Sequence, residues 1–324
     1  MKPLNNEDYA LSNIRDLGRI GKAKITLPDS TLDKMKEFEE VMLENCHLPI
    51  QFDTRKHYSP EKYSSYYPTS MSYTYFSHFM MVNTNETEFN IRLIEKELQS
   101  LHWKKSLVEY EDIFPSTFSS KYEMLDIDPS IEFSEVFFAP GHNWKFTIDY
   151  EKLSEKMDLN PDMVIKPHPL TDDYTIEEYG TDFGFERIIE KNASGDQVLD
   201  KCKKAYYVYS SEYGLKSILK GIPSEHMNRY FLMSPLSYSG IYFNSRKYKL
   251  KDQKKVIGHI LTNPNCGIFD MNKPIEELKE DFTGFLNNLE ELRNYFKPRR
   301  PRFSHEVFRD YKLRMQKKEE TDGR

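Results

Sequence analysis

Short apolar runs of strand character alternate with segments of helical periodicity along most of the chain. The clearest runs are "SEVFFAPG", "DMVIKPHP" and "KAYYVYSSEYG", and each is followed by a stretch whose apolar residues recur at helical spacing. Strands that are joined through helices run parallel, and a parallel sheet needs helices on both of its faces. This pattern predicts an α/β fold built on parallel sheets.

The chain of 324 residues is long enough for two domains of ordinary size, each with its own core. The alternation restarts near Glu132, so we expect two Rossmann-like domains that face a cleft. They would cover residues 1–133 and 134–274, and residues 275–324 would form a long C-terminal helix and a basic tail. The stretch 57–79 is rich in tyrosine and serine and contains prolines, which predicts a long surface loop.

The distribution of charge bears on possible partners. The net charge of -6 argues against a protein that coats nucleic acid through general basicity. Basic residues nevertheless gather in "SRKYKLKDQKK", residues 245–255, and in the tail from Lys297, which includes Arg299, Arg300 and Arg302. Such runs either form a solvated face or dock a polyanion or an anionic membrane.

The spacing of cysteine and histidine disfavours a metal site and a disulfide framework. The three cysteines lie far apart without a Cys-x-x-Cys pair, and the nine histidines form no ligand-like pair. No run approaches the ~18 apolar residues that a transmembrane helix needs, and the N-terminus lacks the apolar core of a signal peptide. We therefore expect a cytoplasmic protein with no transmembrane segment, no metal and no tightly bound cofactor.

The stretch "VIKPHPLTDDYT", residues 164–175, ends a predicted strand on Lys166, two prolines and His168. Proline fixes its own φ and pushes the preceding residue towards extended geometry, so the chain cannot continue as a helix here. Open α/β sheets bind ligands at the carboxyl ends of their strands. His168 is therefore either a ligand-binding residue on a stiff loop or the solvated side chain of a rigid turn.

The predicted strand in residues 204–209 ends on two serines, Ser210 and Ser211, which Glu212 follows, and Gly214 opens a helix. Hydroxyls and free N–H groups at a helix N-terminus favour a phosphate, because the unsatisfied donors and the macrodipole both attract an anion. Simple N-capping by a serine is the alternative. Together with the histidine loop, this loop is suited to hold a diphosphate or a phosphodiester from both sides.

The order of these two motifs resembles the C-terminal domain of glycosyltransferases of the two-Rossmann GT-B fold. It is most similar to the bacterial sialyltransferases and Kdo or capsule transferases with a His-Pro and a Ser-Ser motif. The resemblance implies that His168 holds and protonates the leaving phosphate of a nucleotide sugar, while Ser210 and Ser211 hydrogen-bond it and Lys166 adds positive charge. Glu212, Gly214 and His142 would line the same donor site, although an ordinary turn at Gly141 also accounts for His142.

Those families also carry an acidic pair in the N-terminal domain, and one carboxylate of the pair is the general base on the acceptor hydroxyl. The matching residues are Glu111 and Asp112 in "VEYEDIF", which is expected to form an acidic loop after a strand. Ile113 stands where the family has a glycine, so Asp53 is a second candidate for the base. Proton removal from a hydroxyl needs only a positioned base of matched pKa, and a solvated acidic loop is the alternative.

These observations lead us to expect a metal-independent glycosyltransferase whose donor is a UDP- or CMP-sugar. Its expected acceptor is a hydroxymethylated base in phage-type double-stranded DNA, bound through the basic tail and the tyrosine-rich loop in the cytoplasm of a host cell. A bacterial surface glycan, with sialic acid or Kdo as the sugar, is the alternative acceptor. A non-catalytic nucleotide- or DNA-binding module is the alternative to an enzyme.

Overall fold

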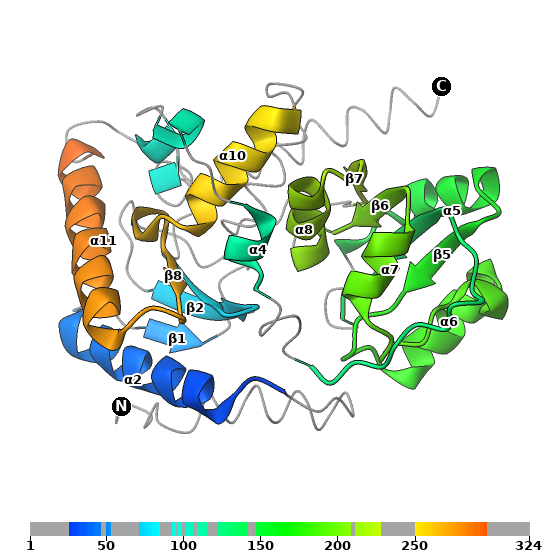
Figure 1. The fold of residues 1–324 in the computed structure, drawn as a ribbon, viewed down its shortest axis with the longest axis horizontal. Helices are drawn as coiled ribbons and strands as arrows, with labels where there is room; N and C mark the ends of the chain where they lie inside the picture. Colours follow the sequence, from blue (N-terminus) through cyan, green and yellow to red (C-terminus); the bar gives the residue numbers. More distant parts are fainter. Residues whose placement is uncertain are drawn as a thin grey trace.

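The computed structural model describes residues 26–46, 50–52, 71–84, 93–94, 96–98, 102–105, 109–115, 122–141, 145, 147–208, 211–227 and 250–296. Within these residues the chain forms two four-stranded sheets that lie side by side with helices around and between them (Figure 1). One sheet has the strand order β1-β2-β3-β8 and the other has the order β5-β4-β6-β7. The predicted α/β character of the chain is confirmed.

The first sheet is mixed. It consists of β1 (Ile50–Phe52), β2 (Met71–Phe76), β3 (Phe79–Thr84) and β8 (Ile268–Asp270). β1 runs parallel to β2, whereas β2 pairs antiparallel with β3, and β3 pairs antiparallel with β8. The expectation of a parallel, Rossmann-like sheet in residues 1–133 is therefore wrong for the strands that the structure describes.

Strand β2 lies inside the stretch 57–79 that was predicted to be a surface loop. Its sequence "MSYTYF" is rich in residues that favour strands, but the polar residues around it hid that signal. The strand is fixed by pairing on both edges, since β1 and β3 flank it. The tight turn between β2 and β3 places Ser77 at φ 50°, the left-handed conformation that such hairpin turns require.

Helices α2 (Asp29–Asn45) and α11 (Ile275–Phe296) cover one face of the first sheet, and both lie at its outer side in Figure 1. Phe38 of α2 and Phe282 of α11 meet Phe269 of β8 with ring centroids 5.1 and 5.8 Å apart. The predicted helix over residues 275–296 is confirmed. Because α11 and β8 belong to this core, the C-terminal part of the chain completes the first sheet.

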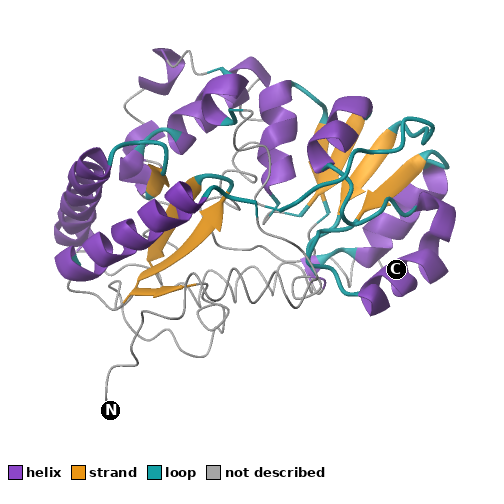
Figure 2. Ribbon diagram, turned by 60° about the horizontal axis from the view of Figure 1, so that its bottom comes forward, coloured by secondary structure: helices purple, strands orange, loops and turns teal. Residues whose placement is uncertain are grey.

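The second sheet is parallel throughout, as predicted. Its strands are β4 (Glu135–Phe138), β5 (Met163–Lys166), β6 (Lys204–Tyr207) and β7 (Ser224–His226). Side chains alternate between the two faces: Phe137 and Ile165 pack with α5 (Tyr150–Leu159) and α6 (Asp173–Phe183), whereas Val136 and Ala205 pack with α7 (Gly195–Lys201). Figure 2 shows this sheet between its two helical layers.

Helix α8 (Glu212–Lys220) follows β6 and connects the two halves of the molecule. Its apolar residues Leu215, Ile218 and Leu219 share one buried cluster with α10 (Leu250–Leu261) and with Phe79 and Met81 of β3. Residues 250–270 were predicted to belong to a second domain over 134–274, yet α10 and β8 pack with the first sheet. Sheet membership therefore does not follow the predicted boundary.

The remaining described elements are short. They are α4 (Tyr110–Ile113), which lies between the two sheets in Figure 1, and the 3₁₀ turns η3 (His102–Lys105), η6 (Phe185–Arg187) and η7 (Pro264–Cys266). The acidic stretch "EDIF", predicted to be a loop, forms most of α4 because Glu109 and Asp112 close a capping box. None of the described helices combines the length and the apolar character needed to span a membrane.

Candidate functional site

The carboxyl edge of the parallel sheet brings the predicted motifs to one side of the molecule. β4 occupies an inner position, with β5 on one side and β6 on the other, so the loops after all three strands open at the same edge. The chain leaves β4 towards β5 and then crosses back to β6, which makes the space between β4 and β6 a topological switch point. Open α/β sheets bind their ligands at such a point.

His168 lies on a β-turn directly after β5. The N–H of Thr171 donates to the carbonyl oxygen of His168 at 2.8 Å, and Pro169 supplies the fixed φ that suits the second position of such a turn. The N–H of Leu170 donates to Nδ1 of the imidazole at 3.1 Å. Since Nδ1 accepts, the neutral imidazole carries its proton on Nε2, which is then a hydrogen-bond donor.

The imidazole of His168 is also held by an aromatic neighbour. The ring of Tyr122 meets it edge to face, with centroids 5.5 Å apart and an interplanar angle of 81°. His168 is half-buried. Tyr122 belongs to the segment that leads into β4, so it is distant from His168 in the sequence. The histidine is therefore fixed in orientation by contacts with its own turn and with a remote segment.

Lys166, predicted to add positive charge to the phosphate site, is turned into the protein. It is the last residue of β5 and is only 4% exposed. Its ammonium group donates to the carbonyl oxygens of Pro167 at 2.7 Å and Lys191 at 2.8 Å. Burial lowers the pKa of Lys166 to about 7, and the nearby charge of Glu190 only partly opposes this. The contacts of Lys166 are therefore structural.

Ser211 is the N-cap of α8, which is the simpler of the two roles considered for the serine motif. Its Oγ accepts from the N–H of Tyr213 at 3.3 Å, so the hydroxyl hydrogen remains available to a further acceptor. Glu212 begins α8 and lies 3.5 Å from the ammonium group of Lys216. The N-terminus of this helix points its positive dipole end towards the switch-point edge.

Gly214 has a packing role that the sequence did not indicate. A Cβ atom at this position would lie 2.4 Å from the ring of Tyr207, the last residue of β6. Close approach of α8 to β6 therefore requires glycine here. This contact places the N-terminal turn of α8 directly over the end of the strand.

The acidic pair lies on α4, next to α8. Both Glu111 and Asp112 are exposed, and Oδ2 of Asp112 accepts from the N–H of Glu109 at 3.1 Å. α4 contacts α8 through two lysines: the ammonium group of Lys216 lies 5.1 Å from the ring centroid of Phe114, and that of Lys220 lies 5.0 Å from that of Tyr110. We call the contact of α4 with Lys216 and Lys220 of α8, between the two sheets, the seam. The acidic pair lies at this seam, and its role as base stays a prediction.

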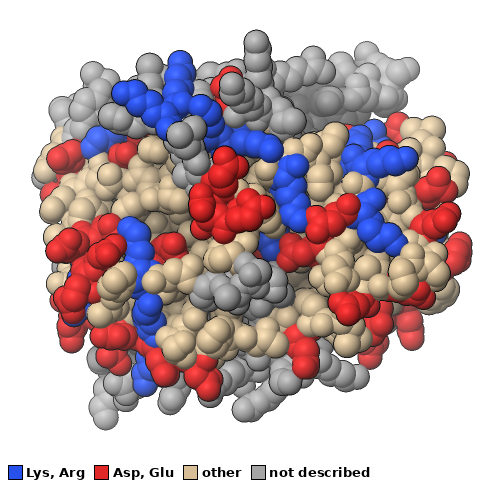
Figure 3. Space-filling model, viewed as in Figure 1, with Lys and Arg blue, Asp and Glu red and all other residues tan. Residues whose placement is uncertain are grey.

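Several predicted site residues lie outside the described part of the chain. They are Asp53, His142, Ser210, Arg299, Arg300 and Arg302. Of the basic run 245–255, the described portion begins α10, and Lys255 donates to the carbonyl oxygen of Lys104 at 2.9 Å. Figure 3 shows acidic and basic side chains interspersed over one face, with basic ones gathered towards the top, where α10 lies.

A charged cluster around the buried Lys216 of α8 was not anticipated from the sequence. Lys216 is 1% exposed and donates to both carboxylate oxygens of Asp196, at 3.0 and 3.1 Å. Burial raises the pKa of Asp196 despite the attraction of Lys216. The only sequence signal was the spacing of four between Glu212 and Lys216, since nothing local connects Asp196 with α8.

The first sheet contributes a second buried titratable group near this cluster. His78, on the turn between β2 and β3, has its Nε2 atom 3.6 Å from Oδ1 of Asp270 in β8. Burial lowers the pKa of His78 to about 4, although Asp270 and Glu212 oppose this shift. Phe79, the residue after His78, shares a buried cluster with Leu215 of α8, so this hairpin turn faces α8 across the seam.

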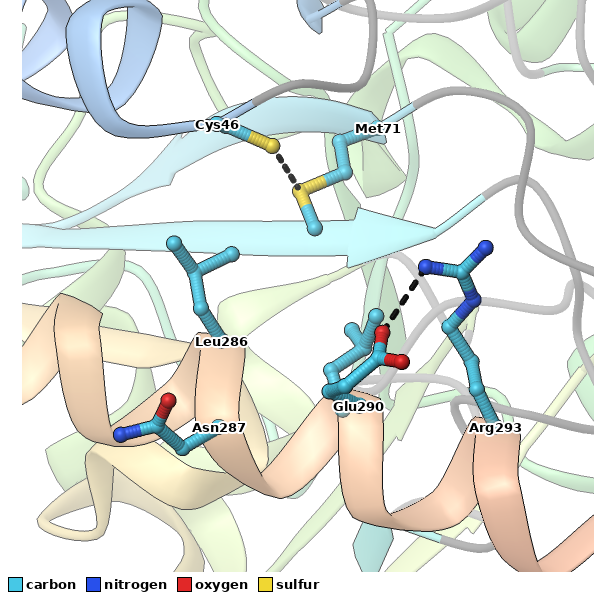
Figure 4. A pocket seen from close by; sticks show the side chains of 7 residues that line it. Cys46, Met71, Leu286, Asn287, Glu290 and Arg293 are labelled. Carbon is cyan, nitrogen blue, oxygen red and sulfur yellow. Dashed lines mark hydrogen bonds and ion pairs between the residues drawn. The ribbon is translucent and has the colours of Figure 1, made fainter.

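A cavity of about 260 Å³ lies elsewhere, between β2 and α11. Figure 4 shows Cys46 and Met71 on one side, with Sγ and Sδ 3.7 Å apart, and residues of α11 on the other, where Glu290 and Arg293 form an ion pair of 2.9 Å. The cavity is mostly apolar and belongs to the first sheet, so it is separate from the His168 and Ser211 loops.

Comparisons with known proteins show neither a family nor a relative for this chain. No protein-family model matches the chain, and no curated protein sequence matches it significantly. These comparisons therefore leave the resemblance in the His-Pro and Ser-Ser motifs untested, and the function that it implies is a proposal.

Proposed function

We propose that this protein is a glycosyltransferase that holds the phosphate of a nucleotide sugar at the carboxyl edge of β5, β4 and β6. The observation that carries the proposal is the pairing of two strand-end loops around β4. One presents the protonated Nε2 of His168, and the other presents Ser211 at the N-terminus of α8. Both loops offer donors, as a phosphate requires.

In the proposed reaction, the bond between the anomeric carbon and the phosphate oxygen breaks and its electron pair stays on the phosphate. His168 donates from Nε2 to that oxygen, while Ser211 and the N–H groups of α8 stabilise the developing charge. The acceptor hydroxyl attacks the anomeric carbon and gives its proton to a carboxylate. Donors that are already in place cost no reorganisation when the charge develops, which is the main advantage of such a site.

The seam supports this assignment of roles. α4, with Glu111 and Asp112, lies beside α8, so carboxylates from the N-terminal half of the chain and phosphate donors from the parallel sheet occupy neighbouring elements. DNA as the acceptor and metal independence remain predictions from the sequence, and a surface glycan is the other acceptor class.

The proposal is tested first by binding. We expect CMP or UDP, at about a hundred times its dissociation constant, to stabilise the protein by about 2.7 kcal/mol in a thermal-shift assay. The His168→Ala variant should lose most of this stabilisation, whereas the same substitution at His259 of α10, outside the proposed site, should retain it. A protein that responds to none of CMP, UDP, GDP or their sugars would contradict the proposal.

Turnover separates an enzyme from a binding module. We expect donor hydrolysis by the wild type and a loss of about a hundredfold or more in His168→Ala, since a fixed hydrogen-bond donor to a developing charge contributes about 10²- to 10³-fold. His168→Gln keeps an N–H donor near the position of Nε2 but lacks the fixed orientation of the imidazole, so its rate should be intermediate. Nucleotide binding without any hydrolysis or transfer would favour the non-catalytic alternative.

A further inference from the structure

The segment after η6 returns alongside the end of β5 and supports the turn that carries His168. The N–H of Ile189 donates to the carbonyl oxygen of Ile165 at 2.8 Å, and Ile188 forms a parallel bridge with Ile165. Ile189 is 3% exposed, so this strand-like segment is fixed to the sheet by burial as well. It brings Lys191 next to the residues that follow β5.

Lys191 contacts the turn at both of its ends. Its carbonyl oxygen accepts from the ammonium group of Lys166 at 2.8 Å, and that ammonium group also binds the carbonyl oxygen of Pro167. The ammonium group of Lys191 donates to the carbonyl oxygen of Thr171 at 3.1 Å and to Oδ1 of Asp173 at 3.1 Å. His168 lies between Pro167 and Thr171, the two residues that are tied down.

We propose that Lys191, acting with Lys166, is a positioning residue that holds His168 in its tautomer and orientation. The inference rests on the proposed function for what the histidine does, but the two-lysine clamp is a property of the fold. Lys166 is buried, and a buried amino group is costly unless its hydrogen bonds are satisfied. It satisfies them by binding the carbonyl oxygens of Pro167 and Lys191, and it thereby holds these two backbone groups together. The clamp keeps the turn closed while Leu170 N–H binds Nδ1.

The first test follows the imidazole itself in the protein without nucleotide. Two-bond proton–nitrogen correlation in protein labelled with ¹⁵N-histidine distinguishes a proton on Nε2 from one on Nδ1. We expect His168 to carry the proton on Nε2 in the wild type and in Lys191→Arg, which keeps the charge and the donors. In Lys191→Met, which keeps only the length, we expect a mixture of both tautomers.

A matched control is Lys203→Met. Lys203 is exposed, lies in the same half of the protein, and its ammonium group makes no hydrogen bond or ion pair with any described residue. It should leave the tautomer of His168 unchanged. If Lys191→Met does not fold, Asp173→Ala is the second variant. The side chain of Asp173 is 67% exposed, so its loss should not prevent folding. This variant removes the carboxylate partner of Lys191 but keeps the hydrogen bond to Thr171, and it should give a smaller change of the tautomer in the same direction.

The second test measures function. We expect Lys191→Met to weaken binding of CMP about tenfold, the equivalent of one charged hydrogen bond, and to lower kcat more than it raises KM. A folded Lys191→Met with the wild-type tautomer and CMP affinity would overturn the clamp. A shift of tautomer in a protein that binds no nucleotide would support the clamp and contradict the proposed function, so the two failures are distinguishable.

Discussion

At the scale of single residues, the two basic side chains of the Lys-Pro-His-Pro motif have opposite surroundings. His168 is half-buried, with Nδ1 occupied by its own turn, whereas the amino group of Lys166 is enclosed and bound to two carbonyl oxygens. The lysine of the motif therefore holds the backbone, and the histidine is the residue that remains suited to meet a ligand.

The enclosure of Lys166 has a measurable effect on stability. Burial lowers its pKa from 10.5 to about 7. Between these values the unfolded chain binds a proton that the folded protein does not, so the free energy of unfolding should rise as the pH increases above 7. Urea titrations at several pH values between 6.5 and 9 measure this slope. Lys166→Met should reduce the rise.

The upper limit of pH 9 reduces the contribution of two competing groups to this measurement. Burial raises the pKa of Cys202 from 9.0 to about 11 and also raises the pKa of Cys266, so the folded protein keeps protons there that the unfolded chain loses. This effect lowers stability above pH 9 and has the opposite sign. Equal pH slopes for the wild type and Lys166→Met below pH 9 would show that Lys166 keeps an ordinary pKa.

At the scale of elements, α8 and its N-cap combine three roles. Its N-cap Ser211 belongs to the proposed phosphate site, Gly214 allows close contact with β6, and the apolar residues on its other side pack against α10. A shift of this helix would thus change the site and the seam together. Its position depends on the absence of a side chain at Gly214.

Substitution of two helical glycines should separate packing from helix propensity. We expect Gly214→Ala to destabilise the protein by about 1–3 kcal/mol, because the new methyl group would overlap the buried ring of Tyr207. Gly284→Ala in α11 is the matched control: the nearest atom, Oδ1 of Asn265, lies 3.9 Å away, so the gain in helix propensity should stabilise by up to about 1 kcal/mol. Denaturant melts measure both, and a neutral Gly214→Ala would contradict the close packing of α8.

At the scale of the whole molecule, the buried cluster between α8 and α10 joins the two sheets. It includes Ile218 from the parallel half and Ile257 and Met81 from the other half, each at most 3% exposed. Such a continuous apolar contact couples the two halves energetically. The pairs that buried Lys216 forms with half-buried Asp196, and buried His78 with half-buried Asp270, lie along the same seam.

This coupling predicts a single unfolding transition. Hydrogen exchange of backbone amides, followed across a urea titration, reports on each half separately, because β3 belongs to the first sheet and β5 to the parallel sheet. We expect coincident denaturation midpoints, and Ile218→Ala should lower both by the same amount. Two separate midpoints in the wild-type chain would show that the halves unfold independently.

The local patterns in the sequence predicted the parallel half of the fold well. Apolar runs of strand length, helical periodicity and strand-end prolines located β4, β5, β6, α5, α6 and α8, because each signal is carried by adjacent residues. The same signals placed His168 and Ser211 at strand ends. The long helix α11 was equally visible, since its apolar stripe continues through 22 residues.

Long-range pairing was outside the reach of those patterns. Strand β8 has three residues and pairs with β3 far away in the chain, and β2 is fixed by neighbours on both sides. The inward turn of Lys166, its link to Lys191 and the burial of Lys216 likewise depend on which segments meet. The sequence by itself determined most elements of the parallel half, the helix α11 and the residue types at the strand ends. The tertiary structure decided how the first sheet pairs and which charges are enclosed, because pairing and burial arise only when distant segments pack.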